Sequence, residues 1–419
     1  MSGYDSANTN PSQNDYVRGD KTGDIAESYD FFRYGVKTDI NDTFSVGVLY
    51  DEPFGAAAEY TQSNFVSQGD VDASIASITN GAAPSLAAAQ GAIGALAAGE
   101  TAGVLTPEQQ AQLDGLRGAV AVAQAEAGNA GENTNVEVRS QSLTGILGMK
   151  FGANKNFQIY GGPVAQRIQS ETKLRGLAYG PATGYTSNSN PDMDYGYIAG
   201  IAYSKPEIAL KAALTYRSEI DHDIEISESY PLVAIRAIAA GATPEQAAAA
   251  ANRDSTYEIT TPKSVNFDFQ TGINPTTLAT AKVRWVPWSD FVITPPLYND
   301  VSKRNYGPDG LDLVEYDDDQ WQVELGLAKR VAPALAISGT VGWDSGAGDP
   351  TTSLGPVDGY YSVGLGAKYN VTENWAVSAG GKYLWFGDAK GRLPSGKIVG
   401  DFQDNDGYIA GLKISYQGK

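Results

Sequence analysis

Apolar and polar residues alternate along most of this chain, in paired runs separated by short polar breaks. Six such pairs can be recognised, with breaks at residues 38–43, 152–156, 204–207, 273–277, 330–334 and 370–374. Alternation with a period of two is typical of β-strands, and a short polar break between two such runs indicates a tight turn between antiparallel strands. The segments that connect one pair to the next are long and variable. Short turns at one end and long loops at the other are typical of a transmembrane β-barrel.

The six pairs predict twelve strands, in hairpins near 30–52, 136–170, 195–225, 256–293, 315–343 and 359–386. A thirteenth strand is predicted at 406–416, where every second residue from Tyr408 to Tyr416 is apolar. An unpaired strand edge is costly in lipid, and bacterial single-chain barrels have even strand numbers. We therefore expect residues near Gly3–Asn8 to form a fourteenth strand beside 406–416. The predicted fold class is all-β: a single 14-stranded antiparallel transmembrane β-barrel over residues 1–419.

Two of the long connections have the composition of helices. Residues 71–128 are rich in Ala, Leu and Gln, and Thr106 begins a segment with an N-cap, a proline at the first position and an acid in the first turn. Residues 230–252 repeat this arrangement at Thr243. Both lie on the long-loop side, so we expect helical extracellular insertions there. The other long loops are rich in acids, Asn, Gly and Pro, and we expect them to be solvated; they lie near 8–28, 171–194, 294–314, 344–358 and 387–405.

Composition narrows the class of protein further. The formal net charge of -19 argues against nucleic acid or anionic lipid as charge-driven partners. No apolar run approaches the ~18 residues of a membrane-spanning helix. Cysteine is absent, which excludes disulfides and thiolate metal sites. The chain begins with Met1-Ser-Gly-Tyr-Asp, which has no signal-peptide character, so we expect to be reading a mature or shortened form of an exported protein.

Alternation assigns the strand residues to two faces. The apolar face, expected to meet lipid, carries Leu210, Leu214, Val283, Leu325, Val377 and Leu412. The opposite face is mostly basic and carries Arg33, Lys37, Lys211, Arg217, Lys282, Arg284, Glu324, Lys368, Lys382 and Lys413. Two interpretations remain open: polar lumen residues that pair with neighbouring acids, or a positive interior that attracts carboxylates. Arg217 is the best single candidate for the second, because a guanidinium holds a carboxylate with two hydrogen bonds.

No catalytic constellation is found in the sequence. The single histidine, His222, lies between Asp221 and Asp223 near a strand end. The base of a triad and a metal ligand are both possible roles, but we expect a solvated loop residue. The acids at 315–319 and 221–223 could bind Ca²⁺ weakly, yet such groups more often solvate a loop. We therefore predict no catalytic residue, no metal, no cofactor and no enzyme.

Several segments resemble FadL-type outer-membrane long-chain fatty acid transporters. They are Ala213-Leu-Thr-Tyr-Arg-Ser-Glu219, Pro262-Lys-Ser-Val-Asn-Phe-Asp, Val283-Arg-Trp-Val-Pro-Trp-Ser-Asp-Phe291 and Trp343-Asp-Ser, within a resemblance that covers about residues 30–416. The resemblance implies a fourteen-stranded barrel with an N-terminal hatch. It also implies that hydrophobic ligands dock on the outer loops, enter an internal pocket and leave through a gap in the wall. We expect ligand-binding residues at Tyr216, Arg217, Lys282, Arg284, Trp288 and Phe291.

The expected function is a channel in the bacterial cell outer membrane for passive uptake of hydrophobic or amphipathic molecules, such as long-chain fatty acids or aromatic hydrocarbons. The expected partners are the lipid bilayer with lipopolysaccharide and a hydrophobic small molecule, with no nucleic acid, and the chain is expected to be a monomer. The glycine-rich hatch and the terminal aromatic residue of that family are not recognisable here. A structural or adhesion barrel, an engineered hatch-less pore without specific transport, and an outer-membrane hydrolase are therefore the alternatives.

Overall fold

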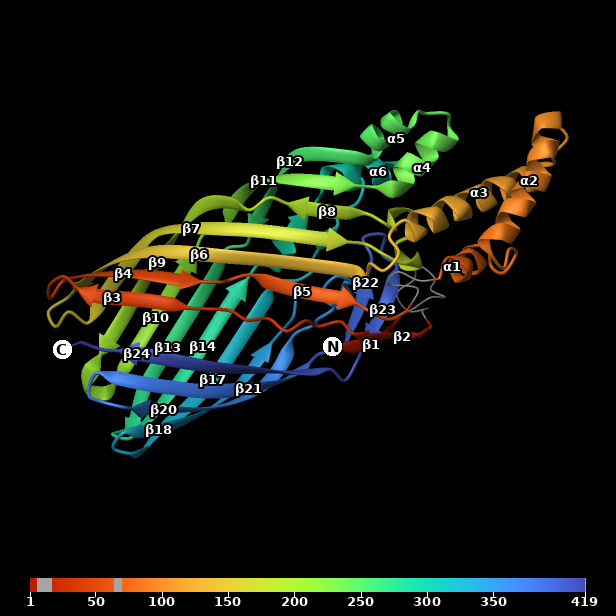
Figure 1. Ribbon diagram of the computed structural model, residues 1–419. Coiled ribbons are helices and arrows are strands. Elements are labelled where there is room, and N and C mark those ends of the chain that lie inside the picture. Colours follow the sequence, from red (N-terminus) through yellow and green to blue (C-terminus); the bar gives the residue numbers. More distant parts are fainter. Residues whose placement is uncertain (6–16, 64–69, 419) are drawn as a thin grey trace.

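The computed structural model describes residues 1–5, 17–63 and 70–418, and its main feature is a barrel of antiparallel strands with helices at one end (Figure 1). Residues that alternate in polarity form the barrel wall, as the sequence predicts. Starting from β3, the barrel consists of β3 (Tyr34–Asp39), β4 (Phe44–Asp51) with β5 (Gly55–Tyr60), β6 (Thr134–Phe151), β7 (Phe157–Lys173), β8 (Thr186–Ser189) with β9 (Asp192–Lys205), β10 (Leu210–Arg217) with β11 (Ile220–Ser229), β12 (Asn252–Thr261) with β13 (Ser264–Asn274), β14 (Thr277–Val286), β17 (Gln320–Ala332), β18 (Leu335–Asp344), β20 (Tyr360–Asn370), β21 (Trp375–Phe386) and β24 (Asp406–Tyr416).

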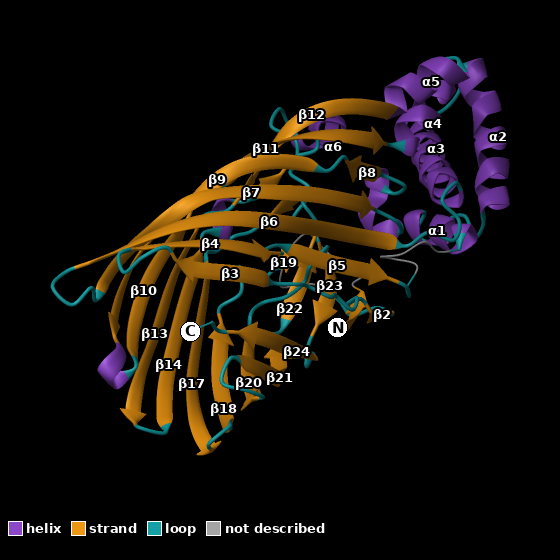
Figure 2. Ribbon diagram, turned by 60° about the vertical axis from the view of Figure 1, so that its left-hand side comes forward, coloured by secondary structure: helices purple, strands orange, loops and turns teal. Residues whose placement is uncertain are grey.

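Four of these strands are broken into two segments on the way to the long-loop end. Three of the breaks contain a proline, namely Pro53 between β4 and β5, Pro191 between β8 and β9, and Pro262 between β12 and β13. Proline lacks a backbone N–H, so it interrupts the ladder of hydrogen bonds between strands. At the fourth break, between β10 and β11, Ser218 accepts a hydrogen bond from the Tyr197 N–H through its side chain (3.0 Å). Beyond the breaks, β11 and β12 extend toward the helices (Figure 2).

The outer face of the barrel is an exposed apolar belt between two rims of aromatic side chains. Val36, Leu365 and Leu412 expose 75%, 73% and 72% of their surface. Near the short turns, ring pairs such as Phe151–Phe157 and Trp375–Tyr416 mark one rim, with centroids 5.6 Å and 5.0 Å apart. Toward the long loops, outward-facing rings of neighbouring strands form the other rim: Trp285, Trp321, Trp343, Tyr361 and Trp385. A belt of this kind matches the hydrocarbon layer of a membrane.

The predicted helical insertions are confirmed. The first contains α1 (Val71–Ile78), α2 (Leu86–Ala102) and α3 (Pro107–Ala127), and the second contains α4 (Pro231–Ala239) and α5 (Pro244–Ala251). Thr106 and Thr243 both form capping boxes, with Gln109 and Gln246 as the reciprocal partners. A further helix, α6 (Pro296–Tyr306), lies in the long connection between β14 and β17. Among the helices that the structure describes, none combines the length and the apolarity that crossing a membrane requires.

The largest buried core lies in the mouth of the barrel at the long-loop end. Segments from the long loops pack there around Tyr185, Tyr298, Val399 and Phe402, each of them at most 6% exposed. Two small sheets belong to this layer: β19 (Thr351–Thr352), β22 (Ala389–Arg392), β23 (Ile398–Phe402), β1 (Ser2–Asp5) and β2 (Lys21–Asp24) form one, and β15 (Val292–Ile293) with β16 (Val314–Glu315) forms the other. The expectation that these loops are simply solvated is therefore wrong. Their few apolar residues are collected into one core that covers the lumen.

The pairing predicted for the N-terminal residues is also wrong. β1 pairs with β2 and β23, with Gly3 opposite Gly23 and Tyr4 opposite Asp401. Asn405 fixes this position, since its side chain accepts from the Ser2 N–H at 2.7 Å and donates to the Ser2 carbonyl at 3.0 Å. Residues 1–5 therefore join the sheet in the mouth and do not form the fourteenth strand of the wall. Residues 6–8 of the predicted pairing lie outside the described residues.

Candidate ligand-binding site in the lumen

Three arginines gather around one aspartate inside the barrel, at the level of the strand breaks. Asp51 ends β4, is 7% exposed, and its Oδ2 lies 3.7 Å from both Arg217 Nη1 and Arg33 Nη2. Arg284 on β14 also interacts electrostatically with Arg217 and Asp51, and donates to Asn266 Oδ1 at 3.4 Å. Two guanidinium groups thus lie 3.7 Å from one carboxylate, and that of Arg284 interacts with it over a longer distance. This set, Arg33, Asp51, Arg217 and Arg284, is called the guanidinium cluster below, and it carries an excess of positive charge.

The guanidinium cluster is not saturated with hydrogen bonds. Arg217 donates from Nη2 to Ser142 Oγ at 2.9 Å, but its Nε has no acceptor. Asp51 Oδ1 and the hydroxyl of Thr144 are likewise buried without a partner. An unmatched buried polar atom costs roughly 1–3 kcal/mol, so a group that supplies acceptors here would be bound favourably. A carboxylate is the natural match to a guanidinium, because the two groups are planar and form parallel hydrogen bonds.

Four aromatic side chains lie beside the guanidinium cluster, toward the long-loop end. Phe54 lies in the β4–β5 break three residues after Asp51, and Trp288 follows β14 four residues after Arg284. The Trp288 ring lies 5.9 Å from Phe54, 5.2 Å from Phe291 and 5.5 Å from Tyr316, measured between centroids. Trp288 Nε1 donates to Gln320 Oε1 at 2.8 Å, which fixes the indole. Burial raises the pKa of Tyr316 to about 12. We call these four residues the aromatic cluster.

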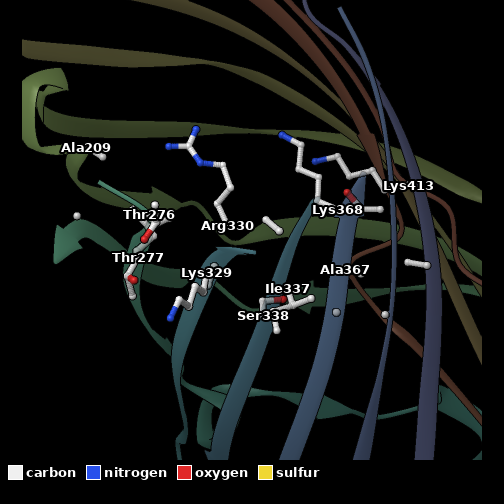
Figure 3. Close-up of a pocket in the computed structure, with 18 of the residues that line it drawn as sticks. Ala209, Thr276, Thr277, Lys329, Arg330, Ile337, Ser338, Ala367, Lys368 and Lys413 are labelled. Carbon is white, nitrogen blue, oxygen red and sulfur yellow. The ribbon is translucent and has the colours of Figure 1, made fainter. Parts of the chain in front are cut away.

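A cavity of about 690 Å³ occupies the lumen at the short-turn end. Glycines 366, 380 and 411 leave room along its wall. Arg330, Lys368 and Lys413 extend their charged ends into this space from three strands (Figure 3). Higher in the lumen, by contrast, Lys282 and Lys382 both pair with Glu324. Positive charge therefore continues from the guanidinium cluster to the short-turn end of the channel.

The structure brings four of the six predicted ligand-binding residues into the two clusters. Arg217 and Arg284 belong to the guanidinium cluster, while Trp288 and Phe291 belong to the aromatic cluster. Lys282 is in the lumen, but its Nζ lies 3.7 Å from Glu324 Oε1. Tyr216 lies on the outer face, with its ring centroid 6.0 Å from that of Tyr197. The alternation that turns Arg217 inward turns its neighbour outward, so the two side chains do not share a site.

Sequence reasoning missed Asp51, Phe54, Ser142 and Tyr316. The first two flank Pro53, and a proline inside an alternating run is the signal that could have indicated a strand break with special residues beside it. Nothing local in the sequence marks Ser142 or Tyr316. Glu219, two residues after Arg217 in the sequence, does not pair with it, since the Glu219 Oε2 lies 3.2 Å from Lys263 Nζ.

His222 is not the solvated loop residue that the sequence suggested. It lies inside β11, and 0% of its surface is exposed. Its Nδ1 is 3.1 Å from Asp192 Oδ2, and its Nε2 is 3.1 Å from Gln166 Oε1. The acids on either side of it in the sequence, Asp221 and Asp223, point outward and are exposed, because β11 alternates buried and exposed positions.

The chain resembles known proteins in sequence and in fold. A family profile described as "Outer membrane protein transport protein (OMPP1/FadL/TodX)" matches residues 5–417. The crystal structure of a Pseudomonas aeruginosa FadL homologue superposes with a TM-score of 0.63 at 13% identity, covering 99% of this chain and 86% of that one. The Pseudomonas putida toluene transporter TodX gives a TM-score of 0.48 at 10% identity, covering 92% and 81%. No curated protein is similar enough in sequence to count as a match.

Proposed function

Because the chain belongs to the OMPP1/FadL/TodX family of outer membrane transport proteins, we propose that it carries amphipathic carboxylates, such as long-chain fatty acids, passively across the membrane. The family and its FadL-type fold make the chain a bacterial outer-membrane channel for hydrophobic molecules, and not an enzyme. The choice of substrate within that class is the proposal.

The guanidinium cluster beside the aromatic cluster is the observation that carries the proposal. A fatty acid has one anionic end and one apolar end, and the two clusters offer a partner to each. Burying the chain yields ~25 cal/mol per Å² of apolar surface, and a hydrogen bond to a charged group adds roughly 1.5–3 kcal/mol. The unmatched Nε of Arg217 is the specific donor that a carboxylate would satisfy.

The remaining features fit an entry and an exit for such a ligand. An apolar depression at the mouth is lined by Tyr230, Tyr298, Leu354 and Leu393, with Arg236 at its side. These residues belong to the core of the mouth, so the depression offers a first contact at that core. At the other end, the cavity with Arg330, Lys368 and Lys413 provides a second region of positive charge. A carboxylate would be drawn through the lumen from one positive region to the next, with no chemical step.

A neutral aromatic hydrocarbon is the second candidate substrate. It is favoured by the aromatic cluster, whose rings form an apolar site that needs no head group. The two candidates differ in what they require of the arginines: the hydrocarbon would use only the aromatic cluster.

Binding of matched ligands to the purified protein in detergent tests the proposal. A long-chain fatty acid and the alcohol of equal chain length share the apolar part and differ in charge. We expect the acid to bind about ten to a hundred times more tightly, following the energy of a charge-assisted hydrogen bond. Trp288→Ala should lower the affinity for the acid and for the alcohol by the same factor. Equal affinities for acid and alcohol in the wild-type protein would reject the fatty acid as the substrate and would favour the neutral hydrocarbon as the substrate.

A further inference from the structure

We propose that Asp192, Asp194 and His222 form a binding site for a divalent first-row transition metal ion, of which Zn²⁺ is the representative. One ligand atom from each residue, a carboxylate oxygen or an imidazole nitrogen, lies within 4.8 Å of the other two. Asp192 and Asp194 project from the same side of β9, and His222 comes from β11. The site lies between the β8–β9 and β10–β11 breaks and shares no residue with the guanidinium and aromatic clusters.

The hydrogen bonds of His222 leave a place for a cation beside Nδ1. Gln166 Nε2 donates to Ser142 Oγ at 3.3 Å, and Gln166 Oε1 accepts from Thr261 Oγ1 at 2.8 Å. With the amide oriented this way, His222 Nε2 must carry the proton that it shares with Gln166 Oε1 over 3.1 Å. In the neutral imidazole, Nδ1 then directs a lone pair at Asp192 Oδ2, 3.1 Å away. Two acceptors then face each other, and a cation between them, either a proton or a metal ion, satisfies both.

The surroundings of His222 have the form found around metal-bound histidines. Such a histidine donates its second ring N–H to a carbonyl or carboxylate, which fixes the tautomer and the ring orientation. Gln166 fills that role here, and both Gln166 and His222 are 0% exposed. The imidazole therefore has one tautomer and one orientation, with Nδ1 toward the two carboxylates.

The donor set indicates which ions fit. One imidazole nitrogen with two carboxylate oxygens is a ligand set that Zn²⁺ accepts, whereas soft ions such as Cu(I) prefer the thiolates that this chain lacks. Three protein ligands leave a position for water. The Asp192 side chain is 26% exposed, so an ion can enter from solvent. Exposed acids on the outer face of β11, including Asp221 and Asp223, would raise the local cation concentration.

A metal at this place would join β9 to β11 across their breaks, and through Gln166 it would also hold β7. The experiment uses the full chain in detergent, freed of metal with a chelator and titrated with Zn²⁺ alone. We expect one tightly bound ion per chain by elemental analysis of the gel-filtered protein, and an X-ray absorption spectrum with nitrogen and oxygen but no sulfur neighbours. Asp192→Asn with Asp194→Asn should lower the affinity at least a hundredfold.

The matched control is Asp221→Asn with Asp223→Asn, which removes two acids from the outer face of the same region. This variant should retain the tightly bound ion. The proposal is overturned if the wild-type protein retains no ion after gel filtration. It is equally overturned if the control loses affinity as much as the double variant of the site, because the ion would then be held by surface charge. His222→Gln, which keeps a polar side chain, should show the same loss as the site variant.

Discussion

Arg217 and His222 lie on consecutive segments of one broken strand and are joined by a single polar path. Arg217 Nη2 and Gln166 Nε2 both donate to Ser142 Oγ, at 2.9 Å and 3.3 Å, and Gln166 Oε1 is 3.1 Å from His222 Nε2. The guanidinium cluster and the proposed metal site are therefore parts of one hydrogen-bonded network across β6, β7, β10 and β11. A substitution at Ser142 should therefore affect both the guanidinium cluster and the proposed metal site.

Ser142→Ala leaves two buried donors without their acceptor, on Arg217 and on Gln166. We expect the free energy of unfolding to fall by roughly 1–3 kcal/mol and the affinity for a fatty acid to fall with it, because Arg217 loses its orientation. Urea unfolding in lipid vesicles and fatty acid titration measure the two effects. Ser338→Ala, at the distant cavity of the short-turn end, serves as control. An unchanged stability would show that the network contributes nothing.

Gly162 on β7 is packed directly against the neighbouring strand. A Cβ at this position would lie 1.9 Å from the Gly145 carbonyl oxygen, which is backbone and cannot move aside. We expect Gly162→Ala to lower the free energy of unfolding by at least about 1–3 kcal/mol, the usual cost of overpacking.

Gly91→Ala is the matched control for this substitution. Gly91 lies inside α2, where an added Cβ meets nothing within 4 Å. Replacing it should slightly stabilise the helix, by roughly 0.5–1 kcal/mol. Thermal unfolding gives the melting temperatures of both variants, and we expect that of Gly162→Ala to be the lower. Similar melting temperatures for the two would contradict the packing described for β6 and β7.

The orientation of the barrel predicts which lysines face the outside of the cell. Lys303 lies on α6 at the long-loop end, and Lys155 lies in the turn between β6 and β7 at the opposite end. A membrane-impermeant amine reagent added to whole cells should modify Lys303 and spare Lys155, with both modified after lysis. Peptide mass analysis identifies the sites. Modification of Lys155 in intact cells would show that the barrel has the opposite orientation.

The core of the mouth should make stability depend on alkaline pH through Tyr316. Burial raises its pKa from the ordinary value of about 10 to about 12 in the folded protein. Below pH ~10 the residue is neutral in both states, and its full contribution is present. Above that the unfolded chain loses the proton first, so the free energy of unfolding falls as pH rises toward 12. Unfolding measured across this range should depend less steeply on pH in Tyr316→Phe than in the wild-type protein. An equally steep dependence in the variant would contradict the burial of Tyr316.

Local sequence patterns predicted those strands and helix starts that depend only on interactions between residues close together in the chain. Strict alternation located the strands of the wall, and the Thr-Pro-Glu-Gln segments at Thr106 and Thr243 located two helix starts, since a capping box needs only neighbouring residues. The same alternation placed Arg217 and Arg284 in the lumen. It could also have excluded Tyr216 from the ligand site, because adjacent residues of a strand face opposite sides.

Contacts between distant segments could not be predicted in this way. His222 looked solvated because its neighbours in the chain are acids, yet these point outward while Gln166, 56 residues away, covers the ring. Asn405 holds the N-terminal strand in the mouth across 403 residues. The long loops contain too few apolar residues to form a core individually, and only their assembly around Phe402 buries them.

The affinity of Arg217→Ala for a charged and for a neutral ligand tests the central claim most directly. If the guanidinium cluster holds the carboxylate, the variant should lose roughly 1.5–3 kcal/mol of binding free energy for a long-chain fatty acid and almost none for the alcohol of the same length. Arg330→Ala, in the separate basic cavity, should affect the binding of the acid much less. An equal loss for acid and alcohol, accompanied by a lower melting temperature, would show that Arg217 only supports the wall through Asp51 and Ser142, and would contradict the account.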